Sequence, residues 1–181
     1  MIPRPFRRSA ENRNIASLYG AIVAQARSPV FYSNYGVPDT VEGRFDLIVL
    51  HLVLVLHRFE REGEPGELLG QRLFDAFCRD LDGNLREMGI GDLAVPKHMR
   101  RFGEAFYGRR AAYLAALDTG DRAFENALAR NIFQDKALER AVEMARYARA
   151  VVSALDAQER AALMSGEPVF PKPEDFVDAR T

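Results

Sequence analysis

The sequence contains no tryptophan and a single cysteine, Cys78, among its 181 residues. A lone cysteine excludes an internal disulfide framework and every zinc site that is built from several cysteines. The chain also lacks an excess of either charge, since 25 basic residues face 26 acidic ones. A net charge of −1 is not that of a dedicated nucleic-acid-binding protein, so no sequence-specific contact with nucleic acid is expected.

No apolar run is long enough to cross a bilayer. The longest, residues 47–56, is interrupted by His51, whereas a membrane-spanning helix needs about 20 apolar residues. The first residues carry Arg4, Arg7 and Arg8 without an apolar stretch, so they do not form a secretory signal.

The motifs of common catalytic sites are missing as well. None of the three histidines, His51, His57 and His98, follows a glutamate by three residues, which excludes the Glu-x-x-His pairs of helical di-iron sites. The chain has no Gly-x-Ser-x-Gly elbow, no phosphate-binding loop and no glycine cluster of the dinucleotide-binding type. We therefore predict no catalytic residue, no metal and no cofactor, and interpret Cys78 as a small buried apolar side chain.

Helical periodicity dominates the rest of the chain. We predict an all-α fold, a single compact domain of six or seven helices around a central hydrophobic helix. The expected helices cover about 10–27 with Ser9 as cap, 41–62, 67–88, 96–117, 121–133 with Asp121 as cap, 136–155, and a short last helix after an Asp156–Glu159 capping box. Residues 30–38 are expected to form an ordered loop. The organisation is then a basic N-terminal tail (1–9), a helical domain (10–165) and a proline-rich, extended C-terminal tail (166–181).

The segment 41–62 is predicted to be the central helix. Residues 47–56 are apolar on nearly all sides, which is typical of a helix with neighbours all around it. A buried β-strand is the alternative, but the pattern continues with helical length on both sides. His51 lies in line with Arg44 and Arg58, and we expect this polar seam to meet an acid on a neighbouring helix.

A dense group of charges follows in and after the helix at 67–88. Phe74, Phe77, Leu81, Leu85 and Met88 form its apolar stripe, and a second stripe holds Ala76, Asp80, Gly83 and Glu87. Glycine destabilises an exposed helix interior, so Gly83 predicts close approach by another backbone. Acids at such a contact need partners, for which Arg44, Lys97 and Arg109 are candidates.

The same region resembles a known family. The similarity covers roughly residues 10–155, and its most specific part is LREMGIGD (85–92) followed by VPK (95–97). The segments that carry it are LYGAIVAQARSPVFY (18–32), GVPDTVEGRFDLIVLHLVLVLHR (36–58), LFDAFCRDLDGNLREMGIGDLAVPKHMRRFGEAFYGR (73–109), AYLAAL (112–117) and LARNIF (128–133). Together they resemble the ubiquinol–cytochrome c chaperone family.

The resemblance implies a helical, non-enzymatic chaperone for assembly of the cytochrome bc1 complex. It implies newly made cytochrome b as client, together with a small partner protein, the ribosome tunnel exit and peripheral contact with the membrane. Because the domain begins almost at Met1, we expect a bacterial member from an alphaproteobacterium, located in the cytoplasm and at the periphery of the inner membrane; a eukaryotic member would lie on the matrix side of the mitochondrial inner membrane. The residues expected to bind protein are Asp80, Asp82, Arg86, Glu87, Asp92 and Lys97.

Chaperoning a hydrophobic client requires exposed apolar surface. The candidates are the aromatic loop with Phe31, Tyr32 and Tyr35, and the region of Phe102, Phe106 and Tyr107, for which ordinary core packing is the alternative. The basic stretch 97–110 is a second candidate surface, for ribosomal RNA or anionic lipid.

Two other functions are compatible with the residues. The first is an enzyme or small-molecule-binding protein with an acidic cleft, in which Asp80 and Glu87 face inward beside His51. The second is a peripheral membrane protein that binds through Arg4, Arg7, Arg8 and Arg13. An exposed charged surface beside an apolar groove would instead favour the chaperone.

Overall fold

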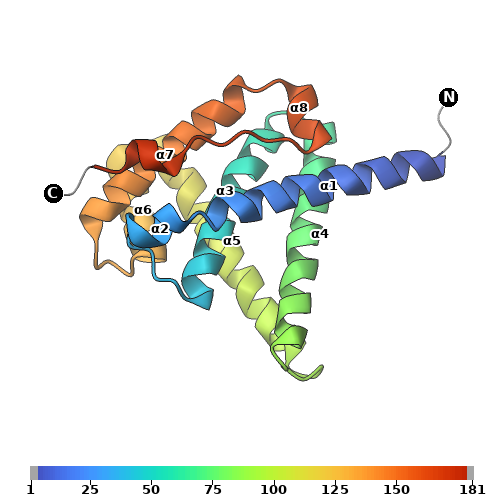
Figure 1. The fold of residues 1–181 in the computed structure, drawn as a ribbon, viewed down its shortest axis with the longest axis horizontal. Helices are drawn as coiled ribbons and strands as arrows, with labels where there is room; N and C mark the ends of the chain where they lie inside the picture. The colour runs from blue at the N-terminus through green and yellow to red at the C-terminus, as the bar shows by residue number, and fades with distance from the viewer. Residues whose placement is uncertain (1–3, 179–181) are drawn as a thin grey trace.

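The protein folds into a helical body with two helices that converge at a projecting tip (Figure 1). The structure, a computed structural model, describes residues 4–178, with side chains from residue 11 onward. Its elements are α1 (Arg4–Ala26), α2 (Pro29–Ser33), α3 (Val41–Glu60), α4 (Glu64–Glu87), α5 (Val95–Thr119), α6 (Asp121–Ile132), α7 (Leu138–Ala157), α8 (Arg160–Ser165) and the 3₁₀ helix η1 (Pro173–Phe176). The predicted all-α fold is confirmed, and residues 4–178 contain no strand.

Helix α3 is the centre of the fold, as predicted. Thr40 caps it, because its hydroxyl oxygen accepts a hydrogen bond from the backbone N–H of Gly43 at 3.1 Å. From Phe45 to Leu56 every residue except Ile48 is buried. Helices α1, α4, α5, α6 and α7 all pack against α3, which explains why its sequence is apolar on nearly every side.

Several predicted boundaries differ from the observed ones. Helix α1 begins at Arg4, so Ser9 lies inside it and does not cap it; residues 1–3 lie outside the described part of the chain. Part of the expected loop at 30–38 is helix α2, which starts at Pro29 and buries Phe31. Asp121 is the first residue of α6, with Gly120 in the cap position.

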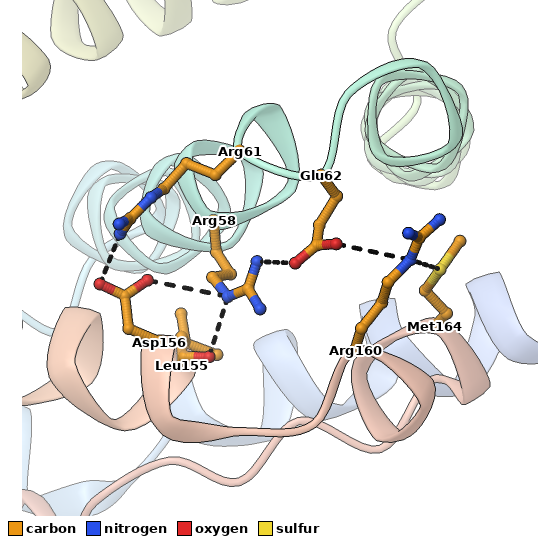
Figure 2. Close-up of polar contacts among 7 residues, drawn as sticks. All are labelled: Arg58, Arg61, Glu62, Leu155, Asp156, Arg160 and Met164. Atoms are coloured by element: carbon orange, nitrogen blue, oxygen red, sulfur yellow. Dashed lines mark hydrogen bonds and ion pairs between the residues drawn. The ribbon is translucent and has the colours of Figure 1, made fainter.

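The capping box predicted for the last helix does not form. Glu159 precedes α8 without a side-chain cap, and the carboxylate of Asp156 turns to the end of α3 (Figure 2). There it contacts Arg61 at 2.6 Å and the Nε of Arg58 at 3.7 Å. Arg58 also donates a hydrogen bond to the carbonyl oxygen of Leu155 at 3.1 Å, so it joins α3 to the end of α7.

A half-buried ion-pair network completes this junction. The side chains of Arg58 and Glu62 are 12% and 16% exposed and form an ion pair with each other. Arg160 of α8 contacts the second oxygen of Glu62 at 3.4 Å (Figure 2). The network therefore connects the ends of α3 and α7 with the start of α8.

We expect Arg58→Ala to lower the free energy of unfolding by roughly 1.5 kcal/mol, because it removes a partly buried ion pair and a hydrogen bond to the backbone. Arg61→Ala is the matched control. Its side chain is exposed and its ion pair with Asp156 is a surface pair, worth less than about 1 kcal/mol. Urea denaturation of both variants tests this, and equal losses would contradict a special role for Arg58.

The C-terminal segment, predicted as an extended tail, packs on the helical body. Gly166 ends α8 at φ 90°, and a Cβ there would lie 2.3 Å from the carbonyl oxygen of Asn14 in α1. Farther on, the Tyr35 hydroxyl donates to the carbonyl oxygen of the buried Pro173 at 2.8 Å. The aromatic ring of Phe170 lies 5.8 Å from that of His51. These contacts place residues 166–173 against α1, the segment after α2, and α3.

Candidate functional site

The six residues predicted to bind protein lie in the second half of α4, in the turn after it and in the first turn of α5. This is the projecting tip in Figure 1. The structure divides them between two surfaces. Asp80 and Glu87 line a groove, whereas Asp82, Arg86 and Asp92 form a separate ion-pair cluster and Lys97 is exposed.

The ion-pair cluster is centred on Arg86. Its Nε donates to Asp82 at 2.7 Å, and its guanidinium also pairs with Asp92. These carboxylates raise the pKa of Arg86, which stays charged. Exposed ion pairs of this kind add little stability, so the cluster is expected to contribute little to folding.

Asp80 joins α4 to α1. Its Oδ2 accepts hydrogen bonds from the Tyr19 hydroxyl at 2.8 Å and from the Asn84 side-chain amide at 3.1 Å. Burial raises the pKa of Tyr19, and the hydrogen bond to Asp80 raises it further, so the phenol remains a donor. Both hydrogen-bond partners of Asp80 are therefore neutral side chains.

The basic partners predicted for these acids are bound elsewhere. Arg44 donates to Asp39 at 2.7 Å, and Arg109 lies 2.7 Å from Asp46. Within residues 11–178, neither Glu87 nor Lys97 forms an ion pair. The predicted backbone approach at Gly83 is also wrong, because a Cβ there would meet nothing within 4 Å. The stripe of small residues and acids therefore faces open space at Gly83, whereas α1 approaches it at Asp80 through Tyr19.

The groove lies between the second half of α4 and the first turns of α3 and α5, with the end of α1 at its edge. It has a volume of about 500 Å³. Its apolar lining consists of Val41, Phe45, Ile48, Phe77, Leu81, Leu85, Met88, Ile90 and Phe102. Its polar lining consists of Tyr19, Arg27, Glu42, Arg44, Asp80, Asn84, Glu87 and His98.

Three phenylalanines from three helices form the floor of the groove. Phe45 of α3 lies 4.9 Å from Phe102 of α5 and 6.1 Å from Phe77 of α4, measured between ring centroids. Phe45 and Phe77 are buried, and Phe102 is half-buried. At the edges, the side chains of Val41 and Met88 are 58% and 63% exposed. The groove is thus an open apolar surface on an aromatic base.

Sequence analysis assigned Leu81, Leu85 and Met88 to the core stripe and did not identify Val41, Ile48 or Ile90. A helical wheel shows which side chains share a face but not whether another helix covers that face. The missing signal was therefore the arrangement of α3 and α5 around α4.

Most of the aromatic side chains proposed as client surface belong to the core. Phe31, Tyr35 and Phe106 are buried, and Tyr32 is half-buried. The alternative of ordinary core packing therefore holds for the first aromatic group. In the second group, Phe102 lies in the groove floor and Tyr107 is exposed.

His51 is fully buried and does not line the groove. Its Nδ1 lies 2.8 Å from the carbonyl oxygen of Leu47 and its Nε2 lies 2.7 Å from the Tyr147 hydroxyl. Since a carbonyl only accepts, Nδ1 carries the proton and Nε2 accepts from Tyr147, which in turn accepts from Gln25 at 2.9 Å. The predicted acidic partner is therefore wrong at His51, which meets a tyrosine, whereas Arg58 of the same seam does contact an acid of a neighbouring helix, Asp156 of α7.

The described residues contain no group of three histidine, cysteine or acidic side chains that is arranged to bind a metal. Within the same residues, no helix has the length and apolar character needed to span a membrane. The acidic cleft beside His51 does not form either, because Asp80 and Glu87 are exposed and His51 is buried.

Known proteins resemble this chain over most of its length. A crystal structure of the Cbp3 homolog from Brucella abortus is 38% identical and superposes with a TM-score of 0.86, covering 98% of this chain and 100% of that one. Ubiquinol-cytochrome-c reductase complex assembly factor 1 of Xenopus laevis is 26% identical over 158 residues, which are 84% of this chain and 78% of the relative.

The assembly factor of the same name from Mus musculus is 25% identical over 134 residues, and the match spans 45% of that protein. Residues 33–170 match the family described as Ubiquinol-cytochrome C chaperone. That match includes the groove floor and all six residues of the predicted site. The chain therefore belongs to the ubiquinol–cytochrome c chaperone family.

Proposed function

We propose that this protein is a non-enzymatic assembly chaperone for the cytochrome bc1 complex and that it binds newly made cytochrome b. The observation that carries the proposal is the open apolar groove beside an exposed charged surface. A membrane protein that has left the ribosome exposes apolar side chains, and a groove of this kind shields them until assembly. The names of the relatives support the same process, because they are assembly factors of the ubiquinol–cytochrome c reductase complex.

The two surfaces of the tip suggest two roles. The groove, with Asp80 and Glu87 at its rim, would hold the client. The ion-pair cluster of Asp82, Arg86 and Asp92, together with Lys97, is exposed and separate from the groove, so it would contact a small partner protein. Arg100 and Arg101 of α5 are also exposed and add positive charge, which supports electrostatic contact near the ribosome tunnel exit. A protein that acts near the ribosome tunnel exit would lie on the cytoplasmic side of the inner membrane.

Deletion of the gene tests the role in assembly. We expect loss of b-type haem absorbance from membranes together with loss of quinol–cytochrome c reductase activity, because cytochrome b without its chaperone is not assembled. The wild-type gene should restore both. A deletion strain with unchanged cytochrome b would contradict the proposal.

Variants locate the function in the groove. The double variant Val41→Asp/Met88→Asp places charges at two exposed edge positions and should not restore cytochrome b. The matched control is Leu138→Asp/Val169→Asp, since these side chains are 56% and 66% exposed and lie outside the groove. Val41 and Leu138 are each the first residue of a helix, so these two changes make equivalent demands on the fold. Equal restoration by both would exclude the groove as the client site.

A further inference from the structure

The rim of the groove carries negative charge that the protein itself does not neutralise. Glu42, Asp80 and Glu87 are exposed at this rim. Asp80 has only neutral hydrogen-bond partners, and within the described residues the side chains of Glu42 and Glu87 form neither a hydrogen bond nor an ion pair. Of the two rim cations, Arg44 is bound to Asp39 and Arg27 is left alone against three carboxylates.

These charges have a spacing that fits a helix. Asp80 and Glu87 are seven residues apart on α4, which is two turns, or about 10 Å along the axis. Next to them, Leu81, Leu85 and Met88 form an apolar strip at i, i+4 and i+7. The wall of the groove therefore presents an apolar strip with an acid at each end of one edge.

We propose that the groove binds an amphipathic helix of about three turns that carries two basic residues seven positions apart. Its apolar face lies on Phe45, Phe77 and Phe102, and its two basic side chains meet Asp80 and Glu87. The inference rests on the proposed function, because the helix is then the segment of the client that the chaperone holds. An anionic lipid surface fits this site poorly, since the three rim carboxylates repel phosphate groups.

A pair of synthetic peptides tests the charge specificity. The first is a fluorescein-labelled helix of about 18 residues, long enough to fold, built from leucine and alanine with two lysines seven positions apart. The second has glutamates in place of the lysines. Fluorescence anisotropy with the full chain should give about fivefold tighter binding of the lysine peptide, and this preference should shrink at high salt. Equal affinities would overturn the inference.

Charge reversal on the protein provides the second arm. Glu87→Lys should weaken the lysine peptide about fivefold and strengthen the glutamate peptide. The matched control is Asp118→Lys, an identical charge change at an exposed position in the last turn of α5 and outside the groove, which should leave both peptides unaffected. Val41→Asp/Met88→Asp should abolish binding of both peptides. If the groove variants bind both peptides as the wild type does, the inference is overturned. It is also overturned if the protein binds phosphatidylglycerol vesicles but neither peptide.

The two proposals fail in distinguishable ways. If deletion of the gene removes cytochrome b while both peptides bind alike, the assembly role stands and the basic helix is wrong. If the lysine peptide is preferred while cytochrome b persists in the deletion strain, the specificity of the groove stands and the client is another protein.

Discussion

Leu50→Ala should lower the free energy of unfolding by about 3 kcal/mol, within the range measured for large-to-small changes in well-packed cores. Leu50 is 0% exposed and lies in the middle of α3. Five helices pack around α3, so the neighbours of Leu50 are held from several sides and cannot collapse into the space that the side chain leaves. Most of the cost is therefore expected to be that of an unfilled cavity.

Leu93→Ala is the matched control for this change. It removes the same atoms from a side chain that is 100% exposed in the turn after α4, and the expected change is within about 0.5 kcal/mol. Urea denaturation followed by far-ultraviolet circular dichroism compares the two variants, provided that their unfolding free energies depend equally on the urea concentration. A loss below about 1 kcal/mol for Leu50→Ala would mean that α3 is packed less tightly than its burial indicates.

The central position of α3 was predictable because it is a local property of the sequence. An apolar run from Leu47 to Leu56 that continues at helical length has only one place in a globular domain, which is between other helices. The other long helices were predictable for the same reason, since each shows a periodic apolar stripe. Helix α2 was missed because five residues are too few for periodicity to be detected.

The features that sequence could not predict depend on distant contacts. Tyr147, the partner of His51, lies 96 residues away, and no local pattern connects them. The prolines of the C-terminal segment favour extended backbone, but they do not indicate that this segment contacts Tyr35 and His51. For the same reason the charged residues of the tip were predicted as one site. A helical wheel does not show that Asp80 and Glu87 face a groove whereas Arg86 does not.

Asp46→Asn and His51→Asn should change the pH dependence of stability in opposite directions, each by about 2 kcal/mol between pH 4.5 and pH 7. Both residues lie on α3 and both side chains are buried. Because the substituted amides do not titrate, the difference between each variant and the wild type isolates the titration of the group that was removed.

Burial lowers the pKa of His51 from 6.5 to about 4, against a smaller opposite effect of its hydrogen bond to Leu47. Between these values the unfolded chain binds a proton that the folded protein does not. His51 therefore contributes full stability above pH 6.5, and this contribution is lost as the pH falls towards 4. His51→Asn removes that loss, so the variant should gain stability relative to the wild type as the pH falls.

Asp46 has the opposite effect. Burial raises the pKa of this carboxyl from 3.8 to about 6, although the guanidinium of Arg109 lies 2.7 Å away and acts to lower it. The charge of Glu42 raises the pKa slightly further. Between pH 3.8 and 6 the folded protein therefore binds more protons than the unfolded chain. The stability that Asp46 contributes at low pH is lost as the pH rises through this window, and Asp46→Asn should lose stability relative to the wild type as the pH falls.

Urea denaturation at pH 4.5, 5.5 and 7 measures both differences, with Glu87→Gln as a control that converts an exposed carboxylate to an amide. In the wild type the two contributions nearly cancel, because the pKa shifts are similar in size and opposite in their effect on proton binding. The double variant should then follow the pH dependence of the wild type while each single variant departs from it. If the free energy of unfolding of each single variant instead changes with pH as that of the wild type does, water reaches these two side chains and neither pKa is shifted.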